Sequence, residues 1–181
     1  FTQAVADPMA HKLPFSDSLM GEMIAVVAAH EFGHTIGFPH NMKASFSYPV
    51  DSLRSPTFTK EYGTAPSIMD YARYNYIAQP GDGAHMMPRV GPYDKFAVNW
   101  GYRVLPNIKV PEDETETLNK WTLEQEKNPM FRYGDQQWIT VDPSAQMEDL
   151  GDDAIKASTY GIKNIERIMG YLVDATTTNG K

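Results

Sequence analysis

Apolar residues recur at helical spacing in two stretches of this chain. The first begins at residues 16–18, where Ser and Asp side chains can cap a helix, and continues to about Ile36. Its apolar face consists of Met20, Met23, Ile24, Val27 and Ala28. Gly37 follows, and glycine readily adopts the left-handed conformation that ends a helix in a sharp turn. The pattern therefore predicts one long helix that stops at this glycine.

The second stretch covers residues 152–173. Its apolar positions are Ile155, Ile162, Ile165, Met169 and Leu172. Asp152 and Asp153 fall in the first turn, where the helix dipole favours negative charge. We therefore expect a second long helix near the C-terminus.

The rest of the chain shows weaker patterning. Short helices are predicted over about residues 93–100 and 118–127, and residues 138–141 are the best candidate for a strand. Residues 38–66 are rich in Ser, Thr, Pro and Tyr and have little period, so they predict a long irregular segment. Loops of that length inside a compact domain are usually functional or disordered. The pattern as a whole favours a helix-dominated fold with little sheet.

Composition narrows the class of protein. A chain of 181 residues can bury a core of its own, and 41% hydrophobic and 22% charged residues are ordinary values for a globular domain. The net charge of −7, without a local basic cluster, argues against a nucleic-acid partner. Cysteine is absent, which excludes disulfides and thiolate zinc sites, and the longest apolar run, residues 23–29, is too short to span a membrane.

The predicted first helix carries the pattern HExxHxxGxxH, from His30 to His40. His30 and His34 are four residues apart, so on a helix they project from the same face and can bind one ion. Gly37 allows the turn that can return His40 to them as a third ligand. Three imidazoles leave one tetrahedral position open for water, which is the arrangement of a catalytic zinc site.

Zinc is the metal that this ligand set favours, although copper, nickel or cobalt would also bind three imidazoles. Glu31 follows the first histidine and can reach a metal-bound water without binding the metal. The predicted chemistry is metal-assisted hydrolysis of an amide bond. In this chemistry Glu31 accepts a proton from the water as general base and then delivers it to the leaving amine.

A second motif, residues 67–71 with the sequence SIMDY, lies downstream of His40. Together with HExxHxxGxxH it resembles the signature of the metzincin clan of zinc metalloproteases, in which a Met-turn follows the three histidines. By this resemblance Met69 packs beneath the histidines, and residues 91–102 form the helix after the turn. Residues 18–102 are most similar to a group of large zinc-dependent metalloproteases from Bacteroidetes.

The resemblance implies an α+β, α-dominated zincin fragment. We expect residues 1–105 to be the zinc-binding part of a metzincin-like catalytic domain, and residues 106–181 to form a C-terminal helical extension packed on it. Metzincin domains normally begin with a sheet and a backing helix, but only 29 residues precede His30. The N-terminal sheet is therefore expected to be largely missing, with the rest of the parent polypeptide N-terminal to Phe1.

The resemblance also assigns a role to Tyr71, which matches a tyrosine that astacin-like and serralysin-like enzymes place near the metal. Its hydroxyl would either ligate zinc in the resting state or hydrogen-bond the oxyanion in the transition state. The alternative is that Tyr71 only packs, as one aromatic residue in a run with Tyr74 and Tyr76. Asn41 departs from the pattern, because several metzincin families carry an acidic residue after the third histidine.

The sequence therefore predicts a zinc-dependent peptidase, an endopeptidase acting on peptide or protein substrates, with His30, His34 and His40 on Zn²⁺ and Glu31 and Tyr71 as catalytic residues. Two alternatives stay open. One is a non-catalytic metal-binding or scaffold module, and the other is a zinc hydrolase of a non-peptide substrate. The resemblance alone places the parent protein in the periplasm, at the cell surface or in the medium.

Overall fold

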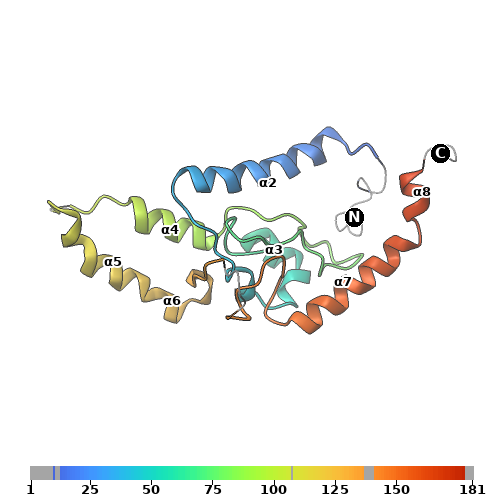
Figure 1. Ribbon diagram of the computed structural model, residues 1–181. Coiled ribbons are helices and arrows are strands. Elements are labelled where there is room, and N and C mark those ends of the chain that lie inside the picture. The colour runs from blue at the N-terminus through green and yellow to red at the C-terminus, as the bar shows by residue number, and fades with distance from the viewer. Residues whose placement is uncertain (1–9, 11–12, 107, 137–140, 178–181) are drawn as a thin grey trace.

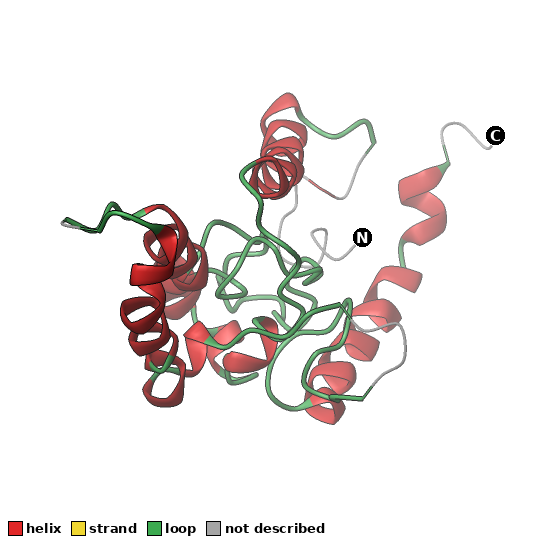
Figure 2. Ribbon diagram, turned by 60° about the vertical axis from the view of Figure 1, so that its left-hand side comes forward, coloured by secondary structure: helices red, strands yellow, loops and turns green. Residues whose placement is uncertain are grey.

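The computed structural model describes residues 10, 13–106, 108–136 and 141–177. Within these ranges the chain is helical and contains no strand (Figures 1 and 2), so the predicted dominance of helix is confirmed. Of the predicted strand, residues 138–140 lie outside the described residues. The α-helices are α2 (Asp17–Thr35), α3 (Pro56–Tyr62), α4 (Pro92–Tyr102), α5 (Thr115–Thr122), α6 (Glu124–Lys127), α7 (Ala154–Met169) and α8 (Leu172–Thr176). Short 3₁₀ helices are η2 (Ser45–Ser47), η3 (Ser52–Arg54), η4 (Pro111–Glu114) and η5 (Pro129–Phe131).

The helices surround a centre made of irregular chain (Figure 2). In Figure 1, α2 runs along one side of this centre, α7 and α8 lie at one end, and α4, α5 and α6 gather at the other. The short helices predicted at 93–100 and 118–127 correspond to α4 and to the pair α5 and α6. No helix in the described ranges combines the length and the apolar character needed to cross a membrane. The division at residue 105 stays a prediction.

The ends of α2 agree with the sequence prediction. Ser16 is the N-cap, and its hydroxyl oxygen accepts a hydrogen bond from the Leu19 amide at 3.3 Å. At the other end Gly37 has φ +86°, in the left-handed region that glycine tolerates best. The amide of Phe38 donates to the Gly33 carbonyl at 3.0 Å, which closes the last turn. The glycine therefore ends the helix and turns the chain back toward it.

The packed face of α2 is not the apolar face that the sequence indicates. Met20, Ile24 and Val27 are 42%, 60% and 57% exposed. The buried positions of the helix are Leu19, His30 and Gly33. Apolar side chains occur around most of this helix, so their spacing identifies a helix but does not select a face. The face that contacts the rest of the described chain is the one with the histidines and a glycine.

Half of the buried residues of the largest core cluster come from residues 38–66, which the sequence predicts as irregular. Its buried members are Tyr48, Val50, Leu53, Ile77, Leu150 and Ala157. Helix α3 also lies in this segment, capped by the Ser55 hydroxyl, which accepts from the Phe58 amide at 3.2 Å, and with Pro56 in its first turn. The cap followed by proline is a local helix signal, and seven residues are too few for apolar periodicity to show it.

Buried irregular backbone needs hydrogen-bond partners that a sheet or helix would otherwise supply. Fully buried Asn75 meets this need by donating from its amide to the carbonyls of Leu53 at 2.7 Å and His85 at 3.0 Å. The Tyr48 hydroxyl donates to the Tyr62 carbonyl at 2.9 Å. The core is therefore a combination of apolar packing and polar side chains that bond loop backbone.

Helix α7 begins where predicted, with Asp153 as its N-cap, but the single helix predicted over residues 152–173 is wrong at its end, because α7 stops at Met169 and α8 begins at Leu172. The apolar stripe of α7 also points outward. Ile155, Ile162, Ile165 and Met169 are between 57% and 83% exposed. The packed face instead carries Asn164, whose side-chain amide donates to the carbonyls of Tyr76 and Ala78 at 2.8 Å each. These two hydrogen bonds to loop backbone orient the helix, and apolar periodicity could not have predicted them.

Two glycines of α2 give a matched test of how tightly this helix packs. A Cβ added to Gly33 would lie 2.2 Å from the Met69 sulfur, whereas one added to Gly21 would meet no atom within 4 Å. We expect Gly33→Ala to lower the free energy of unfolding by about 1–3 kcal/mol through overpacking. Gly21→Ala should raise it by about 0.5–1 kcal/mol, because alanine loses less backbone entropy in a helix. Urea unfolding followed by circular dichroism measures both, and equal effects would contradict the packing.

Candidate metal centre

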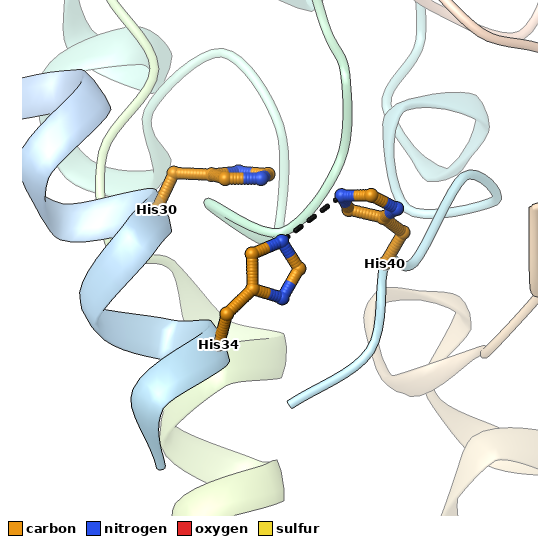
Figure 3. A group of neighbouring side chains, drawn as sticks. All are labelled: His30, His34 and His40. Carbon is orange, nitrogen blue, oxygen red and sulfur yellow. Dashed lines mark hydrogen bonds between the residues drawn. The ribbon is translucent and has the colours of Figure 1, made fainter. Parts of the chain in front are cut away.

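Three histidines converge on one point in the structure (Figure 3). His30 and His34 project from the last two turns of α2, and His40 reaches them from the segment after Gly37. One nitrogen from each ring lies within 4.8 Å of the others, so the three can hold a metal ion. The centres of the His34 and His40 rings are 4.7 Å apart, and those of His30 and His34 are 4.8 Å apart. The helix spacing and the glycine turn together bring this set into contact.

Each of these rings has its Nδ1 committed to an oxygen acceptor outside the cluster. His30 Nδ1 donates to the Ile68 carbonyl at 2.7 Å, and His34 Nδ1 donates to the Phe38 carbonyl at 2.8 Å. His40 Nδ1 donates to the Gln136 side-chain oxygen at 3.0 Å. A neutral imidazole has one N–H, so a ring that donates from Nδ1 presents a lone pair at Nε2. All three lone pairs are therefore available to a metal.

The Nε2 atoms need a cation between them. Those of His34 and His40 are 3.1 Å apart, which is a hydrogen-bond distance (Figure 3). With both rings donating from Nδ1, however, neither Nε2 carries a hydrogen, and two lone pairs at that distance repel. His30 Nε2 is buried and has no hydrogen-bond partner among the described residues, which is costly for a polar atom. Neutral imidazole nitrogens suit zinc, and an ion there would satisfy all three atoms at once. The residues present therefore fit the metal.

The protonation state of His40 also favours metal binding. Burial is the largest influence on its pKa and lowers it below the ordinary histidine value. The hydrogen bond to Gln136 acts in the opposite direction, and the neighbouring rings of His34 and His30 lower the pKa further. His40 therefore stays neutral to a lower pH than a free histidine, and the neutral ring is the form that binds metal.

Met69 packs against α2 at Gly33, the residue before the ligand His34. It is 1% exposed, and its sulfur lies 2.2 Å from where a Cβ on Gly33 would be, so only glycine at that position lets the thioether approach the helix. The Met69 carbonyl also accepts from the Asn41 amide at 3.0 Å. The turn at residues 67–69 thus contacts His30 through Ile68 and the residue after His40 through Met69.

Asp94, in the first turn of α4, holds that turn in place. Its two carboxylate oxygens accept from the Ser67 hydroxyl at 2.6 Å and from the amides of Ile68 at 2.9 Å and Gly91 at 2.7 Å. The side chain is 4% exposed, and burial raises its pKa above the usual value while these hydrogen bonds act in the opposite direction. Sequence reasoning missed this residue, although an acidic side chain three residues after Gly91 is a capping-box signal.

Glu31 and Tyr71 lie at the same cleft. A depression of about 350 Å³ is lined by both residues together with His30, Ile68 and Arg73. The Tyr71 ring is centred 4.3 Å from that of His40 and 5.4 Å from that of His30, and the side chain is 40% exposed. Glu31 is exposed on α2. The structure therefore brings the three histidines together, places Tyr71 against two of them, and places Glu31 at the depression that Tyr71 and His30 line. The catalytic roles of Glu31 and Tyr71 stay predictions.

Asp70 lies behind Tyr71 and has a structural contact. It is 5% exposed, and its carboxylate accepts from the Ser45 amide at 2.6 Å. Burial raises its pKa to about 7, and nearby Asp149 adds to the rise. Asp149 in turn accepts from the Ser45 hydroxyl at 3.1 Å. These two carboxyl groups tie the tail of the 67–70 turn to η2 and to the segment before α7.

Comparison with known proteins gives one match. A family model described as Met-zincin matches residues 12–181, which is nearly the whole chain. The chain belongs to the Met-zincin family. Membership implies a zinc metallopeptidase, in agreement with the histidine cluster and with the metzincin resemblance of the two motifs. No curated protein and no solved structure matches. The finer likeness to Bacteroidetes enzymes stays a prediction.

The first test of the site is its metal content. We expect the purified chain, dialysed without chelator, to retain about one zinc per molecule, because three convergent imidazoles form a complete protein ligand set for a catalytic site. His34→Ala should lose it. His85→Ala is the matched control, because His85 is exposed and lies outside the cluster. Atomic absorption measures the ratio, and retention of zinc by His34→Ala would contradict the assignment.

Proposed function

We propose that this protein is a zinc-dependent endopeptidase that uses Glu31 as general base. The observation that carries the proposal is the set of three Nε2 lone pairs directed at one point beside a cleft lined by Glu31 and Tyr71. His30, His34 and His40 would hold the ion. Bound there, zinc supplies a Lewis acid that makes water nucleophilic near neutral pH and polarises the scissile carbonyl.

Glu31 follows the first ligand in sequence and faces the cleft from α2. Its carboxylate accepts the proton of the attacking water, which makes the water oxygen a better nucleophile. The same carboxylic acid then delivers the proton to the nitrogen of the leaving amine. A purely structural metal site has no use for a carboxylate at this position, so Glu31 favours hydrolysis over a scaffold function.

Tyr71 is the second catalytic residue of the proposal. Its ring packs against both His30 and His40 while the side chain stays 40% exposed, so part of it faces the open cleft. The hydroxyl is then available to donate to the oxyanion that develops from the scissile carbonyl. Met69, packed under the ligands, plays the part of the Met-turn methionine and does not take part in the chemistry.

Replacing Glu31 tests the general base. We expect Glu31→Gln to keep its zinc and to lower kcat about 10²–10⁴-fold, because the amide cannot accept a proton. Glu22→Gln is the control, since Glu22 lies on the same helix but lines a different depression. Cleavage of a peptide library, followed by mass spectrometry, supplies both the rate and the position of the cut bond. Undiminished turnover by Glu31→Gln would refute the role, and cleavage confined to terminal residues would refute endopeptidase action.

Replacing Tyr71 tests the oxyanion donor. We expect Tyr71→Phe to lower kcat by about 10²–10³-fold with little change in KM, because the lost hydrogen bond forms only in the transition state. The ring and its packing on the histidines are kept, so zinc content should not change. Tyr74→Phe is the control, as a neighbouring tyrosine that does not line the cleft. Equal kcat values for Tyr71→Phe and the unmodified chain would reduce Tyr71 to a packing residue.

A further inference from the structure

We infer that Gln136 is a positioning residue for the third metal ligand, His40. The inference rests on the proposed function, because it concerns how one zinc ligand is held. It identifies a residue 96 positions away from His40, outside both sequence motifs. In the structure the two meet through one hydrogen bond, from His40 Nδ1 to the Gln136 side-chain oxygen at 3.0 Å.

His40 differs from the other ligands in what holds it. The Nδ1 groups of His30 and His34 donate to the backbone carbonyls of Ile68 and Phe38, which are acceptors whatever side chain stands there. Only His40 depends on a side chain for this bond. The other end of the Gln136 amide faces the Met147 sulfur at 3.6 Å, so its nitrogen has a weak acceptor and its oxygen is left for the imidazole.

The segment that carries Gln136 is fixed against the segment that carries His40. Fully buried Asn41 accepts from the Gly134 amide and donates to the Arg132 carbonyl, both at 3.0 Å. The Met42 amide donates to the Gly134 carbonyl at 2.8 Å. The two segments therefore lie side by side, joined by backbone and by the side chain that directly follows the ligand.

Gly134 makes this approach possible. A Cβ at that position would lie 2.7 Å from the Cβ of Lys43, which is closer than real Cβ contacts come. With glycine there, residues 132–136 run close enough to residues 40–43 for Gln136 to reach the imidazole. The contact is thus built from both sides, and Gln136 is the residue that meets the ligand.

A held Nδ1–H keeps the lone pair of His40 on Nε2 and keeps the ring directed toward His30 and His34. Without an acceptor at Gln136, the proton can move to Nε2 and the ring can rotate about its side-chain bonds. Either change must be reversed before metal binds. Partners of this kind typically affect metal affinity by about 10–100-fold.

The test uses the whole chain with three substitutions. Gln136→Leu removes the acceptor at similar volume, and Gln136→Glu keeps an oxygen acceptor. Gln146→Leu is the control, since Gln146 lies in the same part of the chain and its side chain donates to the Asp142 carbonyl at 3.5 Å rather than to a metal ligand. Zinc Kd is measured by competition with a chromophoric chelator. We expect Gln136→Leu to raise Kd about 10–100-fold, while Gln136→Glu and Gln146→Leu bind at least as tightly as the unmodified chain.

A second readout separates positioning from general stability. Imidazole ¹⁵N chemical shifts of the metal-free protein report which nitrogen of His40 carries the proton. We expect the Nδ1–H form in the unmodified chain and in Gln146→Leu, and a shift toward Nε2–H in Gln136→Leu. An unchanged tautomer together with a Kd within twofold of the unmodified chain would overturn the inference. If Gln136→Leu does not fold, a Kd for Gln136→Glu weaker than that of Gln146→Leu overturns it instead.

The outcomes for the two proposals are distinct. Tight zinc binding that is insensitive to Gln136 removes the positioning role and leaves the peptidase proposal intact. Tight, Gln136-dependent zinc binding without any peptide cleavage supports positioning and contradicts the proposed activity. An unmodified chain that does not bind zinc contradicts both.

Discussion

The site depends on three hydrogen bonds that point away from the metal position. The Nδ1 groups of His30, His34 and His40 are each bonded to an oxygen, and only this arrangement leaves every Nε2 lone pair directed inward. The acceptors come from three separate parts of the chain, at Ile68, Phe38 and Gln136. A ligand motif that is local in sequence therefore becomes a metal site through contacts that are not local.

Those contacts explain why buried polar side chains are prominent in a fold with so much irregular chain. Asp94 holds the turn that presents Ile68, and Asn41 joins the segments that present His40 and Gln136. Each of them bonds backbone groups that would otherwise be buried without partners. A regular sheet would satisfy such groups by itself, whereas here single side chains do so.

Short-range features of this chain are predictable from its sequence, whereas its long-range contacts are not. The ends of α2, the two long helices and the three ligands follow from short-range rules, such as a capping serine, a glycine at positive φ and a spacing of four residues. The faces that α2 and α7 pack differ from the apolar faces that the sequence indicates, because the packed sides carry His30, Gly33 and Asn164. Apolar periodicity predicts that a segment is helical, but it does not predict which face of the helix packs against the rest of the chain.

Gln136 is a residue whose role could not be predicted from the sequence. No motif singles out a glutamine 96 residues from its partner, since its role exists only once Asn41 and Gly134 have brought two segments together. Asp94 is an intermediate case, because its capping position can be read locally while its contact with the 67–69 turn cannot. The ligands of a metal site can thus be predicted from spacing, but the residues that orient them become visible only in the fold.

The accessibility of the three ligands supports a catalytic site over a purely structural one. His30 is buried, while His34 and His40 are only partly covered. The partly exposed Tyr71 ring packs on His40, and Glu31 lines the same depression. A structural ion gains nothing from solvent access, and closed sites normally supply a fourth protein ligand. In the described chain, a carboxylate from Glu31 and a phenol from Tyr71 line a depression beside His30, which supports the hydrolytic function proposed above.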